Sequence, residues 1–134
     1  MNKDLQFKIL LVEDNPGDAK LAGIFLGASF LKDSLIVNEK TLKGAINALH
    51  KATFDAVLLD LNLLDSKGFG TLEKIMAAHP KANIVIHTGI EENLSIRALR
   101  AGVQDYLTKG NYRLDYLAKT LRFAIERHRR NMLR

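Results

Sequence analysis

The sequence contains no cysteine and no tryptophan, and it has only two prolines among 134 residues. Without cysteine the chain can form neither a disulfide nor a thiolate metal site, and it has no cysteine nucleophile. No stretch approaches the roughly 20 apolar residues that a membrane-spanning helix needs, and the amino terminus lacks the apolar run of a signal peptide. These absences exclude disulfide-bonded scaffolds, and we expect a soluble, cytoplasmic protein with no membrane partner.

Hydrophobic residues make up 47% of the chain, which is enough for one compact core, so we expect residues 1–134 to form a single domain. The net charge of +5 is unevenly distributed. Residues 113–134 hold seven basic and two acidic residues, and the other 112 residues hold 13 of each. A basic terminal segment is weaker evidence for nucleic-acid binding than a basic face, so we do not expect a nucleic-acid partner.

Short apolar runs indicate the strands of a sheet. They are nearly continuous rather than alternating, as in strands that are buried on both faces of a parallel sheet. The runs cover residues 7–12, 56–59, 84–86 and 103–107, with a shorter candidate at 35–37.

Segments with helical spacing lie between these runs. The first covers residues 19–30 with Asp18 as its N-cap, and the last begins near Arg113 and continues towards Arg134. Three others are marked by apolar residues that share one helix face: Leu42, Ile46 and Leu49; Leu72, Ile75 and Met76; Leu94, Ala98 and Leu99 before Gly102 at a C-cap position. The alternation of strand and helix predicts a three-layer α/β fold with a parallel sheet.

Polar residues follow four of the predicted strands. Glu13 and Asp14 follow the first, Asp60 the third, Thr88 ends the fourth, and Lys109 follows the fifth. Each has an ordinary explanation by itself, such as turn formation, strand termination or solvation. Because the carboxyl ends of parallel strands meet at one edge, where ligands bind in such folds, their coincidence indicates a site.

Clustered carboxylates at this edge predict a Mg²⁺ site. Asp14, Asp60 and a nearby backbone carbonyl, such as that of Asn62, would supply enough oxygen ligands, and Glu13 and Asp14 would hold the ion directly or through water. The four histidines show no spacing that indicates zinc: His50, His79, His87 and His128. Mg²⁺ beside a carboxylate, an ammonium and a hydroxyl suits phosphoryl transfer, with the centrally placed Asp60 as nucleophile.

These residues stand in four motifs: ILLVEDNPGD at 9–18, VLLDLNLLDSKG at 57–68, IVIHTG at 84–89 and AGVQDYLTKG at 101–110. Together the motifs resemble the response-regulator receiver domain of bacterial two-component signalling over nearly the whole chain. The resemblance implies a flavodoxin-like (βα)5 fold, a doubly wound parallel sheet with strand order 2-1-3-4-5.

The resemblance also implies residue roles. Asp60 would be phosphorylated by a histidine kinase or a histidine phosphotransfer protein, with Mg²⁺ held by Asp14, Asp60 and the carbonyl of Asn62, and with Glu13 completing the pocket. Lys109 and Thr88 would contact the phosphoryl group. Thr88 and Tyr106 would form a switch that reports to a surface made by the fourth helix, fifth strand and fifth helix.

Four positions depart from the family pattern or correspond to family positions that tune the rate of dephosphorylation. Gly110 replaces the proline that commonly follows the motif lysine in a cis peptide, so the geometry of this loop is open, and Leu64 replaces a frequent proline. In the family, two positions tune the rate of dephosphorylation, and they correspond to Asn62 and Ile90 in this chain. Ile90 offers no polar group to guide water, so we expect slow self-dephosphorylation.

The last segment carries an apolar stripe at Leu114, Leu117, Leu121, Ile125, His128 and Met132. Its polar end, residues 126–134, is a candidate helical linker to a partner or output module, and the stripe also permits a homodimer. The chain is thus either a stand-alone receiver or the receiver end of a longer protein.

Four other functions compete with a phosphorylated switch. A degenerate receiver could act only in docking or dimerisation. An aspartyl phosphatase similar to haloacid dehalogenases needs an acid where Asn62 stands. A flavin module needs a phosphate loop where Glu13 and Asp14 would repel phosphate. A nucleic-acid binder lacks a reading helix.

Overall fold

The computed structural model describes residues 6–89, 92–110 and 115–132. Within these ranges five strands alternate with five helices. Their order is β1 (Lys8–Val12), α1 (Pro16–Gly27), β2 (Leu35–Glu39), α2 (Leu42–Lys51), β3 (Ala56–Leu59), α3 (Phe69–Ala78), β4 (Ile84–Thr88), α4 (Glu92–Ala101), β5 (Asp105–Thr108) and α5 (Tyr116–Met132). Among the described helices, none has the length and apolar character needed to cross a bilayer.

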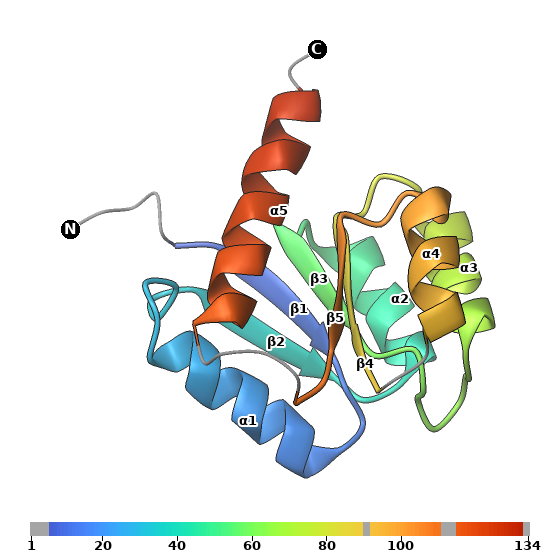
Figure 1. The fold of residues 1–134 in the computed structure, drawn as a ribbon, viewed down its shortest axis with the longest axis horizontal. Coiled ribbons are helices and arrows are strands. Elements are labelled where there is room, and N and C mark those ends of the chain that lie inside the picture. The colour runs from blue at the N-terminus through green and yellow to red at the C-terminus, as the bar shows by residue number, and fades with distance from the viewer. Residues whose placement is uncertain (1–5, 90–91, 111–114, 133–134) are drawn as a thin grey trace.

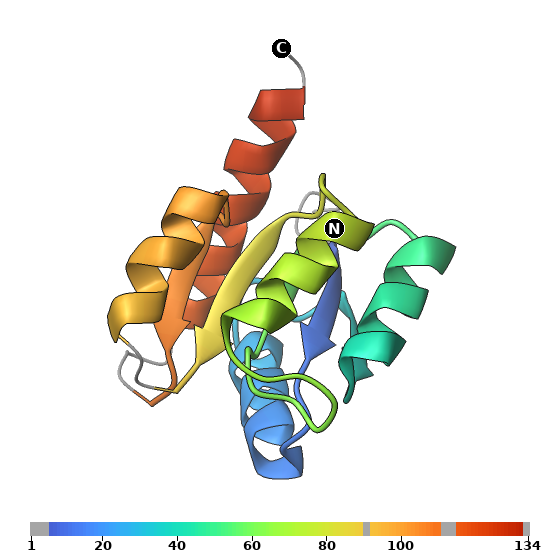
Figure 2. The same cartoon turned by 90° about the vertical axis from the view of Figure 1, so that its right-hand side faces the viewer.

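The strands form one parallel sheet in the order β2-β1-β3-β4-β5, which confirms the doubly wound α/β fold. β3 is buried at every residue, as its continuous apolar run predicts. Val12 pairs with Leu59, and Leu59 pairs with Ile86. This register brings the carboxyl ends of β1, β3 and β4 together at one edge of the sheet (Figure 1), and Figure 2 shows β1 and β4 from a second side.

Helices cover both faces of the sheet (Figure 1). On one face, alternate strand residues such as Leu11 and Leu58 pack against α1 and α5. On the other, Leu10 and Val57 belong to the cluster that includes residues of α2, α3 and α4. The central strands therefore have no solvated face, and polar chemistry is confined to the ends of the strands.

The first helix, α1, begins and ends earlier in the chain than predicted. It runs over Pro16–Gly27 rather than 19–30, and its N-cap is Asn15 rather than Asp18. Proline suits the first helical position because its φ is preset and its missing N–H needs no partner there. The side-chain oxygen of Asn15 accepts a hydrogen bond from the backbone N–H of Asp18 at 3.0 Å, which leaves the carboxylate of Asp18 free for another role.

The core-facing side of the fourth helix, α4, differs from the prediction. Ala98 is buried, but Leu99 is 51% exposed, so Leu99 does not belong to the core-facing stripe. The side chain of Leu94 lies outside the described residues. The helix ends before Gly102, whose φ of +110° confirms the expected glycine terminus.

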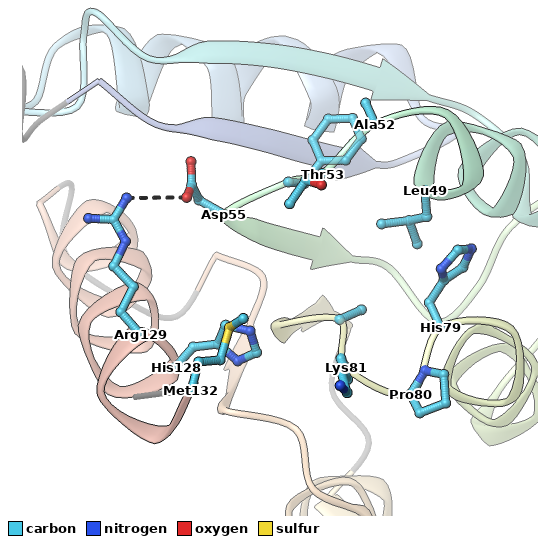
Figure 3. Close-up of a pocket in the computed structure, with 12 residues that line it drawn as sticks. Leu49, Ala52, Thr53, Asp55, His79, Pro80, Lys81, His128, Arg129 and Met132 are labelled. Carbon is cyan, nitrogen blue, oxygen red and sulfur yellow. Dashed lines mark hydrogen bonds and ion pairs between the residues drawn. The ribbon is translucent and has the colours of Figure 1, made fainter. Parts of the chain in front are cut away.

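Helix α5 packs by its first half and extends beyond the sheet (Figure 1). Leu117, Leu121 and Ile125 are buried, whereas Met132 is 67% exposed. Near its end, Arg129 pairs with Asp55 at 3.3 Å, as Figure 3 shows.

This end of α5 forms one wall of a cavity of about 650 Å³ (Figure 3). Leu49 of α2 and the loops that precede β3 and β4 form the rest, with loop residues such as Phe54 and Pro80. Because these loops precede the strands, the cavity lies at the amino edge of the sheet, opposite the polar residues predicted to form the site.

Candidate functional site

Asp60 follows β3 and is buried, and its carboxylate accepts hydrogen bonds from three donors. Its Oδ1 accepts hydrogen bonds from the Thr88 hydroxyl at 2.8 Å and from the backbone N–H of Asn62 at 3.0 Å. Its Oδ2 accepts from Nζ of Lys109 at 2.8 Å. Burial alone would raise the pKa of Asp60, but these hydrogen bonds lower it below its usual value, so the carboxylate stays ionised.

Lys109 reaches the same edge from the end of β5 and contacts three carboxylates. Its Nζ lies 2.6 Å from Glu13, 2.8 Å from Asp18 and 2.8 Å from Asp60. Burial alone would lower the pKa of Lys109, but the hydrogen bonds to these three acids raise it above its usual value. The side chain is therefore a fixed positive charge within an acidic cluster.

Glu13, Asp14 and Asp60 form a cluster suited to a divalent cation. One carboxylate oxygen from each lies within 4.8 Å of the others. Burial and the charge of Asp60 raise the pKa of Glu13 to about 7, although Lys109 partly opposes the shift. Carboxylate oxygens are ligands that Mg²⁺ prefers, and a bound cation would offset the repulsion between these acids, so the residues present fit this ion.

The loop after Lys109 settles a geometry that the sequence left open. The Lys109–Gly110 peptide is trans, because no cis peptide occurs among the described residues. Gly110 has a φ of +74°, a left-handed conformation that glycine adopts at little cost. Replacing the common proline therefore leaves Lys109 in contact with the acidic cluster.

Other predicted site residues lie near this edge or outside the description. The side chain of Asn62 accepts a hydrogen bond from the backbone N–H of Gly68 at 3.2 Å. Tyr106 is half-buried and packs against the core on the side of α2, α3 and α4. Ile90 lies outside the described residues, so its effect on dephosphorylation stays a prediction, as does the switch role of Tyr106.

Asp18 is the site residue that sequence reasoning missed. The sequence predicts a capping role for Asp18, whereas its Oδ2 accepts a hydrogen bond from Lys109 at 2.8 Å. One signal was available. Pro16 favours a helix start at that residue, which places Asp18 in the first turn of the helix, close to the loop that carries Glu13 and Asp14.

Comparison with known proteins decides the family. Residues 9–122 match the family described as the response regulator receiver domain. The chain belongs to this family. Receiver domains act in two-component signalling, and the resemblance seen in the four sequence motifs is confirmed.

Individual relatives agree with this assignment. Response regulator protein PilR of Pseudomonas aeruginosa is 32% identical over 103 residues, which cover 76% of this chain and 22% of that protein. Response regulator protein VraR of Staphylococcus saprophyticus is 33% identical over 107 residues, which cover 78% of this chain and 50% of that protein. The receiver domain thus spans half or less of these curated relatives.

A solved structure shares the fold. The crystal structure of a two-component response regulator from Clostridium difficile matches with a TM-score of 0.77 at 26% identity, covering 91% of this chain and 98% of that one. The strand order 2-1-3-4-5, implied by the resemblance alone, is confirmed by the receiver domain's own sheet.

Proposed function

We propose that this receiver domain accepts a phosphoryl group on Asp60 from a histidine kinase or a histidine phosphotransfer protein. The observation that carries the proposal is the environment of Asp60. Its carboxylate is buried, ionised, and held by Thr88, Lys109 and the N–H of Asn62 at the open edge of the sheet. A charged oxygen nucleophile fixed beside a cation and a hydroxyl donor is suited to in-line phosphoryl transfer.

In the transfer step, an oxygen of Asp60 forms a bond to phosphorus while the bond from phosphorus to the donor's histidine nitrogen breaks. The nitrogen keeps the electron pair of that bond, and Asp60 becomes an acyl phosphate. Lys109 balances charge on the phosphoryl oxygens. Mg²⁺ bound by Glu13, Asp14, Asp60 and the carbonyl of Asn62 would neutralise the same oxygens.

We assign the output to the surface formed by α4, β5 and α5. Thr88 now donates to Asp60, and we propose that it transfers this hydrogen bond to the phosphoryl group while Tyr106 turns inward. Ile96 and Leu99 on α4 and Phe123 on α5 are apolar side chains that are more than half exposed. This surface would contact a partner, a second copy or an output domain joined through residues 126–134.

The alternative is a degenerate receiver that only docks or dimerises. It is not favoured, because Asp60 has the acidic neighbours, the lysine and the hydroxyl that the reaction needs. We propose that the domain's chemistry is self-directed, consisting of phosphoryl acceptance and slow release, with no separate substrate. A cytoplasmic location fits exchange with a kinase and is part of this proposal.

Intact-mass measurement tests the proposal. The protein is incubated with acetyl phosphate and Mg²⁺, with an EDTA sample as the control. We expect one added phosphoryl group, absent in EDTA. If no phosphoryl group is added by acetyl phosphate or by a phosphorylated kinase, the domain is not a phosphoacceptor.

A further inference from the structure

Asp18 has a charged partner but no part in the proposed reaction. It lies in the first turn of α1, and its capping role is taken by Asn15. Its Oδ2 lies 2.8 Å from Nζ of Lys109, which is 91 residues away in the chain. An acid at a helix N-terminus is favoured by the helix dipole, but that effect does not require contact with this lysine.

The ammonium of Lys109 has no remaining proton to donate. A lysine ammonium carries three N–H donors, and three carboxylates surround this one: Glu13, Asp18 and Asp60. A phosphoryl oxygen on Asp60 can therefore gain a full hydrogen bond from Lys109 only if one carboxylate gives up its own.

Exposure identifies the carboxylate that is released most easily. The side chain of Asp18 is 42% exposed, compared with 2% for Glu13 and 7% for Asp60. Water can replace the lost hydrogen bond at an exposed carboxylate, whereas a buried one would be left without a partner. Asp18 can thus leave Lys109 at the lowest cost.

Electrostatic repulsion also disfavours the contact between Asp18 and Lys109 when Asp60 is phosphorylated. A phosphorylated side chain carries a charge of about −1.5 to −2 near neutral pH, which is more than the single charge of a carboxylate. Asp18 and Asp60 each place an oxygen 2.8 Å from the same nitrogen, so these two groups are close neighbours. Phosphorylation at Asp60 would increase the repulsion between them.

We propose that Asp18 is a positioning residue that restrains Lys109 in the unphosphorylated domain and disfavours the phosphorylated one. The proposal rests on Asp60 being the phosphoacceptor. Asp18 holds the ammonium against the acidic cluster and is released when phosphoryl oxygens replace it. The domain's readiness for phosphorylation is thereby set partly by an acid of α1.

Beryllofluoride, a phosphoryl mimic, tests this role. We expect Asp18→Asn to bind it about three- to tenfold more tightly at saturating Mg²⁺, because one partly exposed charge is removed and the side chain keeps its shape. Fluorine NMR of the bound mimic gives the affinity. Glu73→Gln, which removes the charge of an exposed acid on α3, is the matched control and should bind as the wild type does.

A second measurement follows the ion pair itself. In the wild type, the carboxyl ¹³C resonance of Asp18 should shift on adding beryllofluoride, because its hydrogen bond from Lys109 is lost. Equal affinities for the wild type and Asp18→Asn, or an unmoved resonance, would overturn the role of Asp18 alone. Failure of both proteins to bind beryllofluoride would instead overturn the phosphoacceptor function on which it rests.

Discussion

At the residue scale, the surroundings of Glu13 disfavour its negative charge. Burial and the neighbouring charge of Asp60 raise its pKa from 4.5 to about 7, despite the contact with Lys109. Between these values the folded protein binds a proton that the unfolded chain has lost. The contribution of Glu13 to the free energy of unfolding therefore falls as the pH rises through this interval.

We expect Glu13→Gln to match the wild type in stability near pH 5 and to exceed it near pH 8 by at most about 3 kcal/mol, because glutamine cannot ionise. Urea unfolding in metal-free buffer measures the difference at each pH. His87 titrates in the opposite sense, since burial and the charge of Lys109 lower its pKa to about 4. Comparing the two proteins at the same pH cancels that contribution.

Glu73→Gln is the control, because it removes the charge of an exposed acid on α3, and its stability should stay close to that of the wild type. A Glu13→Gln variant that is less stable than the wild type near pH 8 would show that the ion pair with Lys109 outweighs the burial of Glu13.

The positions of most site residues could be predicted because each stands within two residues of the end of an apolar run. A parallel sheet places all such positions at one edge, so Asp60, Thr88 and Lys109 meet whatever the details of the loops. Asp18 could not be placed in this way. Its contact depends on the path of the chain between β1 and α1, which Asn15 and Pro16 set by starting the helix early.

At the scale of elements, α2 is capped partly by a residue from a different loop. Its own N-cap, Thr41, accepts a hydrogen bond from the N–H of Gly44 at 2.9 Å. Asp65 accepts two more, from the N–H groups of Leu42 at 2.8 Å and Lys43 at 3.1 Å. Because Asp65 lies between β3 and α3, these bonds hold the loop that follows the phosphoacceptor strand.

We expect Asp65→Ala to lower the free energy of unfolding by about 1 kcal/mol, the usual value of a helix cap, and Asp65→Asn to lower it less. Burial slightly opposes ionisation, but the two backbone N–H groups dominate and lower the pKa of Asp65 below 3.8. Its contribution is thus present above this value and is lost as the pH falls through the lowered pKa.

Chemical denaturation of the Asp65 variants near neutral pH and near pH 3 measures both effects. Asp33→Ala, which removes an exposed acid before β2, is the control and should change stability little. Equal stability of Asp65→Ala and the wild type at neutral pH would mean that water replaces the cap at no cost.

Elements were predicted less well where burial is partial. The strands buried on both faces have continuous apolar runs, and β3 was placed at its observed bounds. The core-facing side of α4 was predicted wrongly, because Leu99 is exposed, as is Ile96, and Ala98 makes the contact with the core. Residue type alone cannot separate a core-facing leucine from one on an interaction surface.

At the scale of the whole molecule, α5 carries much of the positive charge and extends beyond the sheet (Figure 1). The helix remains tied to the domain near this end. Arg127 donates to the carbonyl of Gln104 at 3.1 Å, and Arg129 pairs with Asp55. The role of residues 126–134 as a linker to a partner or output module stays a prediction.

We expect the exposed apolar side chains of α4 and α5 to support self-association, with Leu99 at 51% and Phe123 at 59% exposure. Sedimentation velocity should show a dimer fraction that rises with concentration and with beryllofluoride. Leu99→Ser and Phe123→Ser should reduce it without unfolding the protein. A monomer under all these conditions would exclude the homodimer.

The central claim is that Asp60 itself carries the phosphoryl group, and chemical mapping tests it most directly. Borohydride reduces an aspartyl phosphate to homoserine, which peptide mass spectrometry locates in the sequence. After incubation with acetyl phosphate and Mg²⁺, we predict homoserine at position 60 in the wild type and none in Asp60→Asn. Homoserine at another acid of the cluster, or none in a protein that has gained phosphate, would contradict the account.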